Sequence, residues 1–151
     1  MIVAHALTEA TVDDAVEGID LVGVAAGGVV SVTGDGAYDT VAFYAAANAR
    51  HARVVVPPTR TAKVSRRRPR SSARDRAIAD VEALGRRQWK KASGYHQQAR
   101  VENAFFRYKT IIGDGLRARR RGGRAVEASL ACNVLNRMTK IGRPESRAIS
   151  R

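Results

Sequence analysis

The clearest pattern in the chain is VVSVTGDG at residues 29–36, a β-branched run that ends in an acid between two glycines. Almost no side chain in this run is polar, which predicts a buried strand over residues 29–33. Asp35 follows the carboxyl end of that strand, where ligands gather in open α/β sheets. A carboxylate there can bind a divalent metal, and Gly34 and Gly36 are expected to let the backbone turn. Asp and Gly also favour plain turns, and spacing alone favours the turn over the metal site.

The segments on either side alternate between strand and helix. Residues 2–7 predict a short strand, and Thr11 is the expected N-cap of a helix that ends near residue 21. Residues 38–50 are alanine-rich and predict a second helix, while residues 53–56 predict another short buried strand. This order predicts an α/β layer fold with a mostly parallel sheet.

The rest of the chain is predicted to be mostly helical. We expect helices from residue 72 to about 89, from about 96 to 110, and from 124 to 141. Gly94 is expected to separate the first two of these helices, because glycine is a frequent helix terminator. Trp89 is interpreted as a core or hinge aromatic residue.

A basic segment at residues 59–76 interrupts this alternation. It combines arginines with Ser, Thr and Pro, which predicts an exposed loop. The residues of this loop that we expect to bind DNA are Arg66, Arg67, Arg68 and Arg70. Contacts of this kind hold phosphates without specifying a sequence. A merely solvated loop is the other interpretation, and the basic character of the whole C-terminal part favours phosphate contact.

Charge is distributed unevenly along the chain. The formal charge is +13, from 27 Lys and Arg against 14 Asp and Glu. Residues 1–50 hold one arginine and seven acids, a net charge of −6, so the remaining residues carry +19. The basic part favours a polyanionic partner, because Lys and Arg release counterions from phosphates. An acidic part beside it favours a metal site next to a DNA-binding surface.

Cysteine content and hydropathy exclude several classes of protein. Cys132 is the single cysteine, which excludes an internal disulfide and a cysteine-based zinc site. We expect it in the core, in a reducing, cytoplasmic setting. No segment reaches the roughly 20 apolar residues of a membrane span, so no membrane partner is expected. A hydrophobic content of 44% excludes a disordered tail.

Glu102 is the second acid of interest and lies within the helix predicted over residues 96–110. Tyr95, Gln98 and Lys109 share its helical face. The opposite stripe is apolar and is expected to face the core; it consists of Val101, Ala104, Phe105, Tyr108 and Ile112. An aromatic residue, an amide, an acid and a base in one row suit a functional site, although a solvated face with a Glu on it is the commoner arrangement.

Taken together, these residues resemble the signature of bacterial insertion-sequence transposases. That signature is Tyr, two residues, Arg, three residues, Glu, six residues and Lys. Tyr95, Glu102 and Lys109 fall on it at the right spacings. Residues 34–39 resemble the segment that holds the second catalytic Asp of the same family. The similarity covers nearly the whole chain and is closest to the insertion-sequence-five group.

The resemblance implies a ribonuclease-H-like α/β core that cuts and transfers DNA strands with an Asp-Asp-Glu triad. Asp35 would be the second acid and Glu102 the third. Two Mg²⁺ or Mn²⁺ ions would bridge the carboxylates, and hard oxygen ligands suit those ions. Tyr95, Gln98 and Lys109 would contact phosphates of the insertion-sequence ends or the target DNA.

The sequence departs from the family pattern in two respects. Gln98 stands where the family has Arg, so it can donate a hydrogen bond but brings no charge and no bidentate fork. The first catalytic Asp is absent, because the family places it upstream of the segment that residues 2–7 match. We therefore expect residues 1–151 to be the C-terminal part of a transposase DDE domain with its first two strands missing.

Such a fragment is expected to have low stability and no cleavage activity by itself. An upstream transposase fragment or a second copy of the chain is then an expected partner besides DNA. Two other interpretations stay open. The chain could be a non-catalytic DNA- or RNA-binding protein whose affinity depends on salt and not on Asp35 or Glu102. It could also be the product of a decayed transposase gene without a function.

Overall fold

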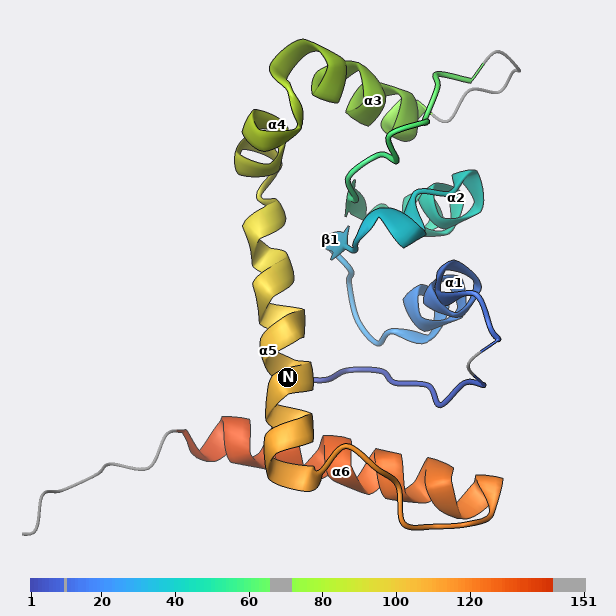
Figure 1. The fold of residues 1–151 in the computed structure, drawn as a ribbon, viewed down its shortest axis with the longest axis vertical. Helices are drawn as coiled ribbons and strands as arrows, with labels where there is room; N and C mark the ends of the chain where they lie inside the picture. The colour runs from blue at the N-terminus through green and yellow to red at the C-terminus, as the bar shows by residue number, and fades with distance from the viewer. Residues whose placement is uncertain (10, 66–71, 143–151) are drawn as a thin grey trace, which may run out of the picture. The chain divides into compact units, whose positions relative to one another are not determined.

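The structure is a computed structural model that describes residues 1–9, 11–65 and 72–142 (Figure 1). The chain divides into two compact units, one formed by Thr8–Glu102 and the other by Met1–Leu7 with Asn103–Arg151. The arginines predicted to bind DNA, Arg66, Arg67, Arg68 and Arg70, lie outside the described residues.

The Thr8–Glu102 unit contains a small parallel sheet. Strand β1 (Ser31–Thr33) pairs with β2 (Arg53–Val55), and Val32 lies opposite Val54. This sheet and the helices around it confirm the prediction of a mixed helix and strand fold with parallel pairing. Both strands are shorter than predicted, and Val30, expected in a buried strand, is 85% exposed. In the described residues β1 has a strand neighbour on one edge, so burial of that segment is incomplete.

Helices α1 (Asp14–Val24) and α2 (Val41–Ala49) pack against each other beside the sheet (Figure 1). The buried centre of this packing joins Val22 of α1, Phe43 of α2 and Val56, which follows β2. Burial of these side chains supplies the main favourable free energy for holding the helices on the sheet.

The start of α1 differs from the prediction. Asp13 is the N-cap, because its carboxylate accepts a hydrogen bond from the backbone N–H of Ala15 at 2.7 Å. The expected cap, Thr11, lies before the helix. An ionised carboxylate suits this position better than a hydroxyl, since it also interacts favourably with the positive end of the helix dipole.

Tyr38 packs between two glycines, and this arrangement shapes the turn after β1. A Cβ atom on Gly34 would lie 2.8 Å from Cδ2 of Tyr38, and one on Gly18 would lie 2.6 Å from its Cε1. The ring also contacts Phe43, with ring centroids 5.1 Å apart. Gly34 therefore makes room for an aromatic ring, whereas the sequence suggested that it supplied backbone freedom.

Arg50 holds the C-terminal end of α1 and the loop that follows it. Its guanidinium donates hydrogen bonds of 2.8–3.1 Å to backbone carbonyls; the acceptors are Val22, Gly23, Ala25 and Gly27. The last carbonyls of a helix have no partner within the helix, and a cation there opposes the negative end of the dipole. One side chain thus fixes the connection between α1 and β1.

Replacing Arg50 with alanine is expected to lower the free energy of unfolding by about 2 kcal/mol, because several hydrogen bonds from a charged donor are lost at once. Urea unfolding followed by circular dichroism measures the effect. Arg87→Ala, which removes an exposed arginine from another helix of the same unit, is the matched control. Equal unfolding midpoints for Arg50→Ala and Arg87→Ala would contradict the role assigned to Arg50.

Two helices replace the single helix predicted over residues 72–89. They are α3 (Ser72–Leu84) and α4 (Arg86–Ser93), and Gly85 between them has φ 76°. A positive φ favours glycine, so this residue ends the first helix. Gly94, at φ 80°, ends α4 as predicted. Trp89 is 5% exposed, which confirms its prediction as a core residue.

The other unit is built on α6 (Arg121–Ile141), against which the π-helical turn η3 (Tyr108–Ile112) packs. The strand predicted over residues 2–7 is absent from the structure. Instead, the N–H of Ile2 donates to Oδ1 of Asn136 at 2.6 Å, and Nδ2 of Asn136 donates to the carbonyl of Ile2 at 2.7 Å. A strand needs the backbone of a neighbouring strand, and here an amide side chain takes that place.

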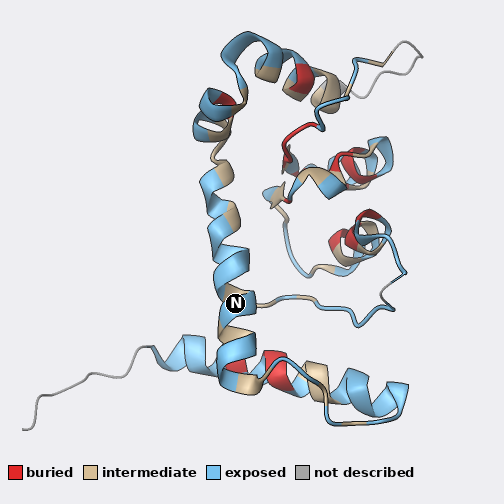
Figure 2. Cartoon of the chain, viewed as in Figure 1, coloured by how far each residue is buried: buried red, intermediate tan, exposed pale blue. Residues whose placement is uncertain are grey.

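The apolar stripe predicted to face the core is exposed. The short helix η2 (Tyr95–Gln98) leads into α5 (Ala99–Arg107), which has no buried residue (Figure 2). Phe105 is 65% exposed, so the prediction for this stripe is wrong. Cys132 of α6 is buried, as predicted. No helix in the described part of the chain combines the length and apolar character that a membrane span requires.

Candidate functional site

Asp35 lies just after β1, where the sequence placed it. Its Oδ1 accepts a hydrogen bond from the N–H of Ala37 at 2.9 Å and so caps the short helix η1 (Gly36–Tyr38). The preceding turn is tied to β2, because the N–H of Gly34 donates to the carbonyl of Val55 at 3.3 Å. The side chain is exposed, and Oδ2 makes no hydrogen bond with the described residues. Asp35 therefore shapes a turn and still presents a carboxylate oxygen to a ligand.

Asp39 is the other acid of this segment, and both of its carboxylate oxygens accept hydrogen bonds from other residues of the protein. Nε of Arg74 donates to its Oδ1 at 2.7 Å, and Nη2 of Arg74 donates to its Oδ2 at 3.0 Å. The N–H of Thr59 also donates to Oδ2, at 2.8 Å. Burial, followed by the charge of Asp39, raises the pKa of the neighbouring Tyr44 to about 12. Of the two acids, Asp35 is the one available for chemistry.

Tyr95 links Asp35 to the helix that carries Glu102. Helix η2, which begins with Tyr95, packs against β1. The pKa of the Tyr95 hydroxyl is raised by burial first, then by the negative charge of Asp35 and then by that of Glu102. Both carboxylates therefore act electrostatically on the same hydroxyl. The ammonium of Lys90 lies 4.7 Å from the centre of the Tyr95 ring, a cation–π contact that steadies the ring.

Glu102 and Gln98 complete this face of the helix. Glu102 is exposed and forms no ion pair in the described residues. Gln98 is half-buried, and its Oε1 is a buried oxygen without a hydrogen-bond donor in the described residues. An unsatisfied buried acceptor costs free energy, so this oxygen is suited to a donor or cation that the chain does not supply.

The donor types on this face suit a hard divalent cation. The carboxylate oxygens of Asp35 and Glu102 and the amide oxygen of Gln98, in the short helix before α5, are of the type that Mg²⁺ and Mn²⁺ prefer. Within the described ranges, no group of three or more His, Cys, Asp or Glu side chains is placed to hold a metal. Asp35 and Glu102 are thus two acids that both act on the Tyr95 hydroxyl, and the described residues add no third acid to them.

The remaining described site residue predicted from the sequence is Lys109. Lys109 is exposed in η3 and belongs to the unit built on α6. The last residues of the segment predicted as a basic loop over 59–76 belong to α3, which begins at Ser72. Sequence reasoning missed the contact of Lys90 with Tyr95 and the pairing of Asp39 with Arg74. A second acid four positions after Asp35 was the only sign of that pairing.

Comparison with protein families gives a match that spans most of the chain. A family model described as a transposase DDE domain matches residues 2–137. That range contains Asp35, Tyr95, Gln98, Glu102 and Lys109. No solved structure matches the chain.

Proposed function

Because this chain belongs to the transposase DDE domain family, we propose that it acts in the transposition of a bacterial insertion sequence of the insertion-sequence-five group. The partner that a transposase domain implies is DNA. The formal charge of +13 supports such a partner, because cationic side chains displace counterions from phosphates. The proposed reaction is metal-dependent cleavage and transfer of DNA strands.

One observation carries the proposal: η2, which leads into the helix of Glu102, packs against β1, which ends just before Asp35, and both acids raise the pKa of the Tyr95 hydroxyl on η2. We assign the two carboxylates to Mg²⁺ or Mn²⁺, which transposases of this family use. Bound ions would activate the attacking oxygen and stabilise the leaving one. Tyr95, Gln98 and Lys109 are proposed to position DNA phosphates beside the carboxylates. The ribonuclease-H-like arrangement is likewise a proposal, supported by the parallel pairing of β1 with β2 and by Asp35 at the end of β1.

The 151-residue chain is proposed to be inactive in cleavage by itself. In the described residues only two acids act on the Tyr95 hydroxyl, and no third carboxylate joins them. Two acids cannot hold both ions of a two-metal site in the required geometry. We propose that the missing acid is supplied by a separate transposase polypeptide, and that this polypeptide or a second copy of the chain is a partner besides DNA.

Incubating the purified chain with Mn²⁺ and duplexes that carry the ends of the encoding element is expected to give no nicking. Adding the polypeptide encoded immediately upstream is expected to produce nicking that Glu102→Gln abolishes. Glu82→Gln, which changes an exposed acid on α3, is the matched control and should leave nicking intact. Efficient nicking by the chain alone, lost in Glu102→Gln, would overturn the proposed inactivity.

A non-catalytic nucleic-acid-binding function is the second candidate, favoured by the basic charge alone. It entails binding that weakens steeply with salt and is unchanged by Asp35→Asn and Glu102→Gln. Absence of Mn²⁺ binding, together with salt-sensitive DNA binding, would favour this function over transposition.

A further inference from the structure

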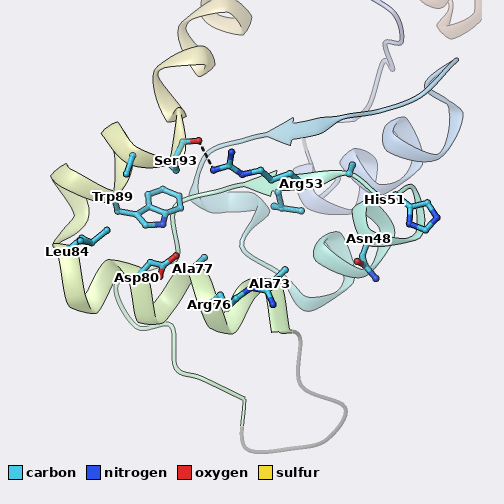
Figure 3. Close-up of a pocket in the computed structure, with 13 residues that line it drawn as sticks. Asn48, His51, Arg53, Ala73, Arg76, Ala77, Asp80, Leu84, Trp89 and Ser93 are labelled. Atoms are coloured by element: carbon cyan, nitrogen blue, oxygen red, sulfur yellow. Dashed lines mark hydrogen bonds between the residues drawn. The ribbon is translucent and has the colours of Figure 1, made fainter.

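A cavity of about 640 Å³ lies within the Thr8–Glu102 unit, apart from the candidate site (Figure 3). Its walls come from the C-terminal end of α2, from β2, and from α3 and α4. Neither Asp35 nor Glu102 lines it. The fold therefore provides a second concave surface that the proposed chemistry does not use.

Two arginines lie on this cavity without a carboxylate partner. Arg53 comes from β2 and Arg76 from α3, and both side chains are exposed. The one ion pair found in the described residues joins Arg74 to Asp39, so neither cavity arginine is neutralised by a neighbour within 4.0 Å. Asp80 lines the same cavity but does not pair with them. The lining thus keeps uncompensated positive charge, which favours an anionic ligand.

Arg53 is held in place for such a ligand. Its Nη2 donates to the backbone carbonyl of Ser93 at 3.2 Å, which ties β2 to the end of α4 (Figure 3). A guanidinium has five N–H donors in a rigid plane, so this bond leaves others to contact an oxyanion. The bond lowers the conformational freedom that Arg53 would lose when a ligand binds.

Part of the cavity lining is apolar. The apolar residues there include Trp89, Leu84 and Ala77, and Trp89 is 5% exposed. A ligand with an anionic group at one end and an apolar body at the other matches this lining. A phosphodiester with its deoxyribose has that character, whereas a bare inorganic anion would leave the apolar wall uncovered.

We propose that this cavity is an additional DNA-binding site that takes one phosphodiester and its deoxyribose from a DNA strand. Arg53 and Arg76 bind the phosphate oxygens, and Trp89 and Leu84 contact the sugar. The charge of Asp80 disfavours a second phosphate in the same space. The inference rests on the proposed function, because it takes DNA as the partner, and it adds a surface that holds the strand away from the carboxylates.

Trp89 is the single tryptophan of the chain and lines this cavity, so all tryptophan emission comes from a residue of the proposed site. Titrating the full chain with single-stranded oligodeoxythymidylate of about 10 nucleotides is expected to change the Trp89 emission. Arg53→Gln and Arg76→Gln are each expected to weaken that response about 10-fold, as expected for loss of a charged hydrogen bond. Each should also reduce the slope of log K against log salt by about 0.7. Arg87→Gln, which removes an exposed arginine of α4 outside the cavity, should leave the Trp89 response unchanged.

Three outcomes would overturn the inference. One is oligonucleotide binding, seen by fluorescence anisotropy, without any change in Trp89 emission. Another is an unaltered response in both Arg53→Gln and Arg76→Gln. The third is an equal response to inorganic phosphate at the same affinity. Asp35→Asn separates this inference from the proposed function: it should lower the affinity for Mn²⁺ at least 10-fold and preserve the Trp89 response. If the unaltered chain bound no Mn²⁺ but kept the Trp89 response, only the proposed metal binding by Asp35 and Glu102 would be contradicted.

Discussion

Replacing Asp39 with alanine is expected to lower the free energy of unfolding of the Thr8–Glu102 unit by about 3–5 kcal/mol. The Asp39 side chain is 0% exposed, and its partner Arg74 is 14% exposed. Without the carboxylate, the Arg74 guanidinium would remain buried without a counter-charge, and the N–H of Thr59 would lose its acceptor. Both changes lower stability, because a buried charge or donor loses its contacts with water and has no partner in the protein to compensate.

Urea unfolding followed by circular dichroism measures this loss, and Asp35→Ala is the matched control. Asp35 lies in the same segment but is exposed, so its loss removes one cap and should cost about 1 kcal/mol. The double variant Asp39→Ala, Arg74→Met should be more stable than Asp39→Ala alone, since it removes the unpaired charge. Equal destabilisation by Asp35→Ala and Asp39→Ala would show that the ion pair does not hold the fold.

Asp35→Asn and Glu102→Gln are each expected to lower the affinity for Mn²⁺ at least 10-fold. Loss of a group that merely supports a metal ligand typically costs about 10–100-fold, and loss of a ligand should cost no less. Both substitutions keep the size of the side chain and remove its charge. Asparagine at position 35 also keeps an oxygen that can accept from the N–H of Ala37.

The free Mn²⁺ signal in electron paramagnetic resonance measures this affinity directly. Asp20→Asn, which changes an exposed acid of α1, is the control and should bind Mn²⁺ as the unaltered chain does. Binding that survives both Asp35→Asn and Glu102→Gln would place the ion elsewhere.

Local sequence patterns were sufficient for the parts of the fold that depend on neighbouring residues. The β-branched run before Asp35 gave the position of β1, and the order of elements gave the parallel pairing with β2. Gly94 was predicted as a helix end because a left-handed residue there favours glycine. Each of these features is decided by backbone preference or by burial of one face.

Features decided by distant contacts were missed or wrong. The partner of Asp39 is Arg74, 35 positions away, and no pattern in the residues near Asp39 predicts which side chain pairs with it. The strand expected over residues 2–7 depended on a neighbouring strand, and the structure pairs Ile2 with an asparagine side chain instead. The exposed position of Phe105 shows that an apolar stripe predicts a buried face only where another element covers it.

The candidate site also combines features that local sequence patterns could predict with features that depend on distant contacts. Helical spacing predicted that Tyr95, Gln98 and Glu102 share one face of a single helix, whereas the structure divides this segment into η2, α5 and η3. Spacing could not predict that η2 packs against β1, the strand that ends before Asp35, because this packing joins distant parts of the chain. The link between the two acids came from family resemblance at the level of sequence, and the pKa of Tyr95 supports it in the structure.

The most direct test of a cation shared by Asp35 and Glu102 is Mn²⁺ binding by the double variant Asp35→Asn, Glu102→Gln. Two ligands of one ion are coupled, so the double variant is expected to bind Mn²⁺ hardly more weakly than either single variant. Losses that multiply, so that the double variant shows the product of the two single effects, would mean that the carboxylates act independently and would contradict the shared site.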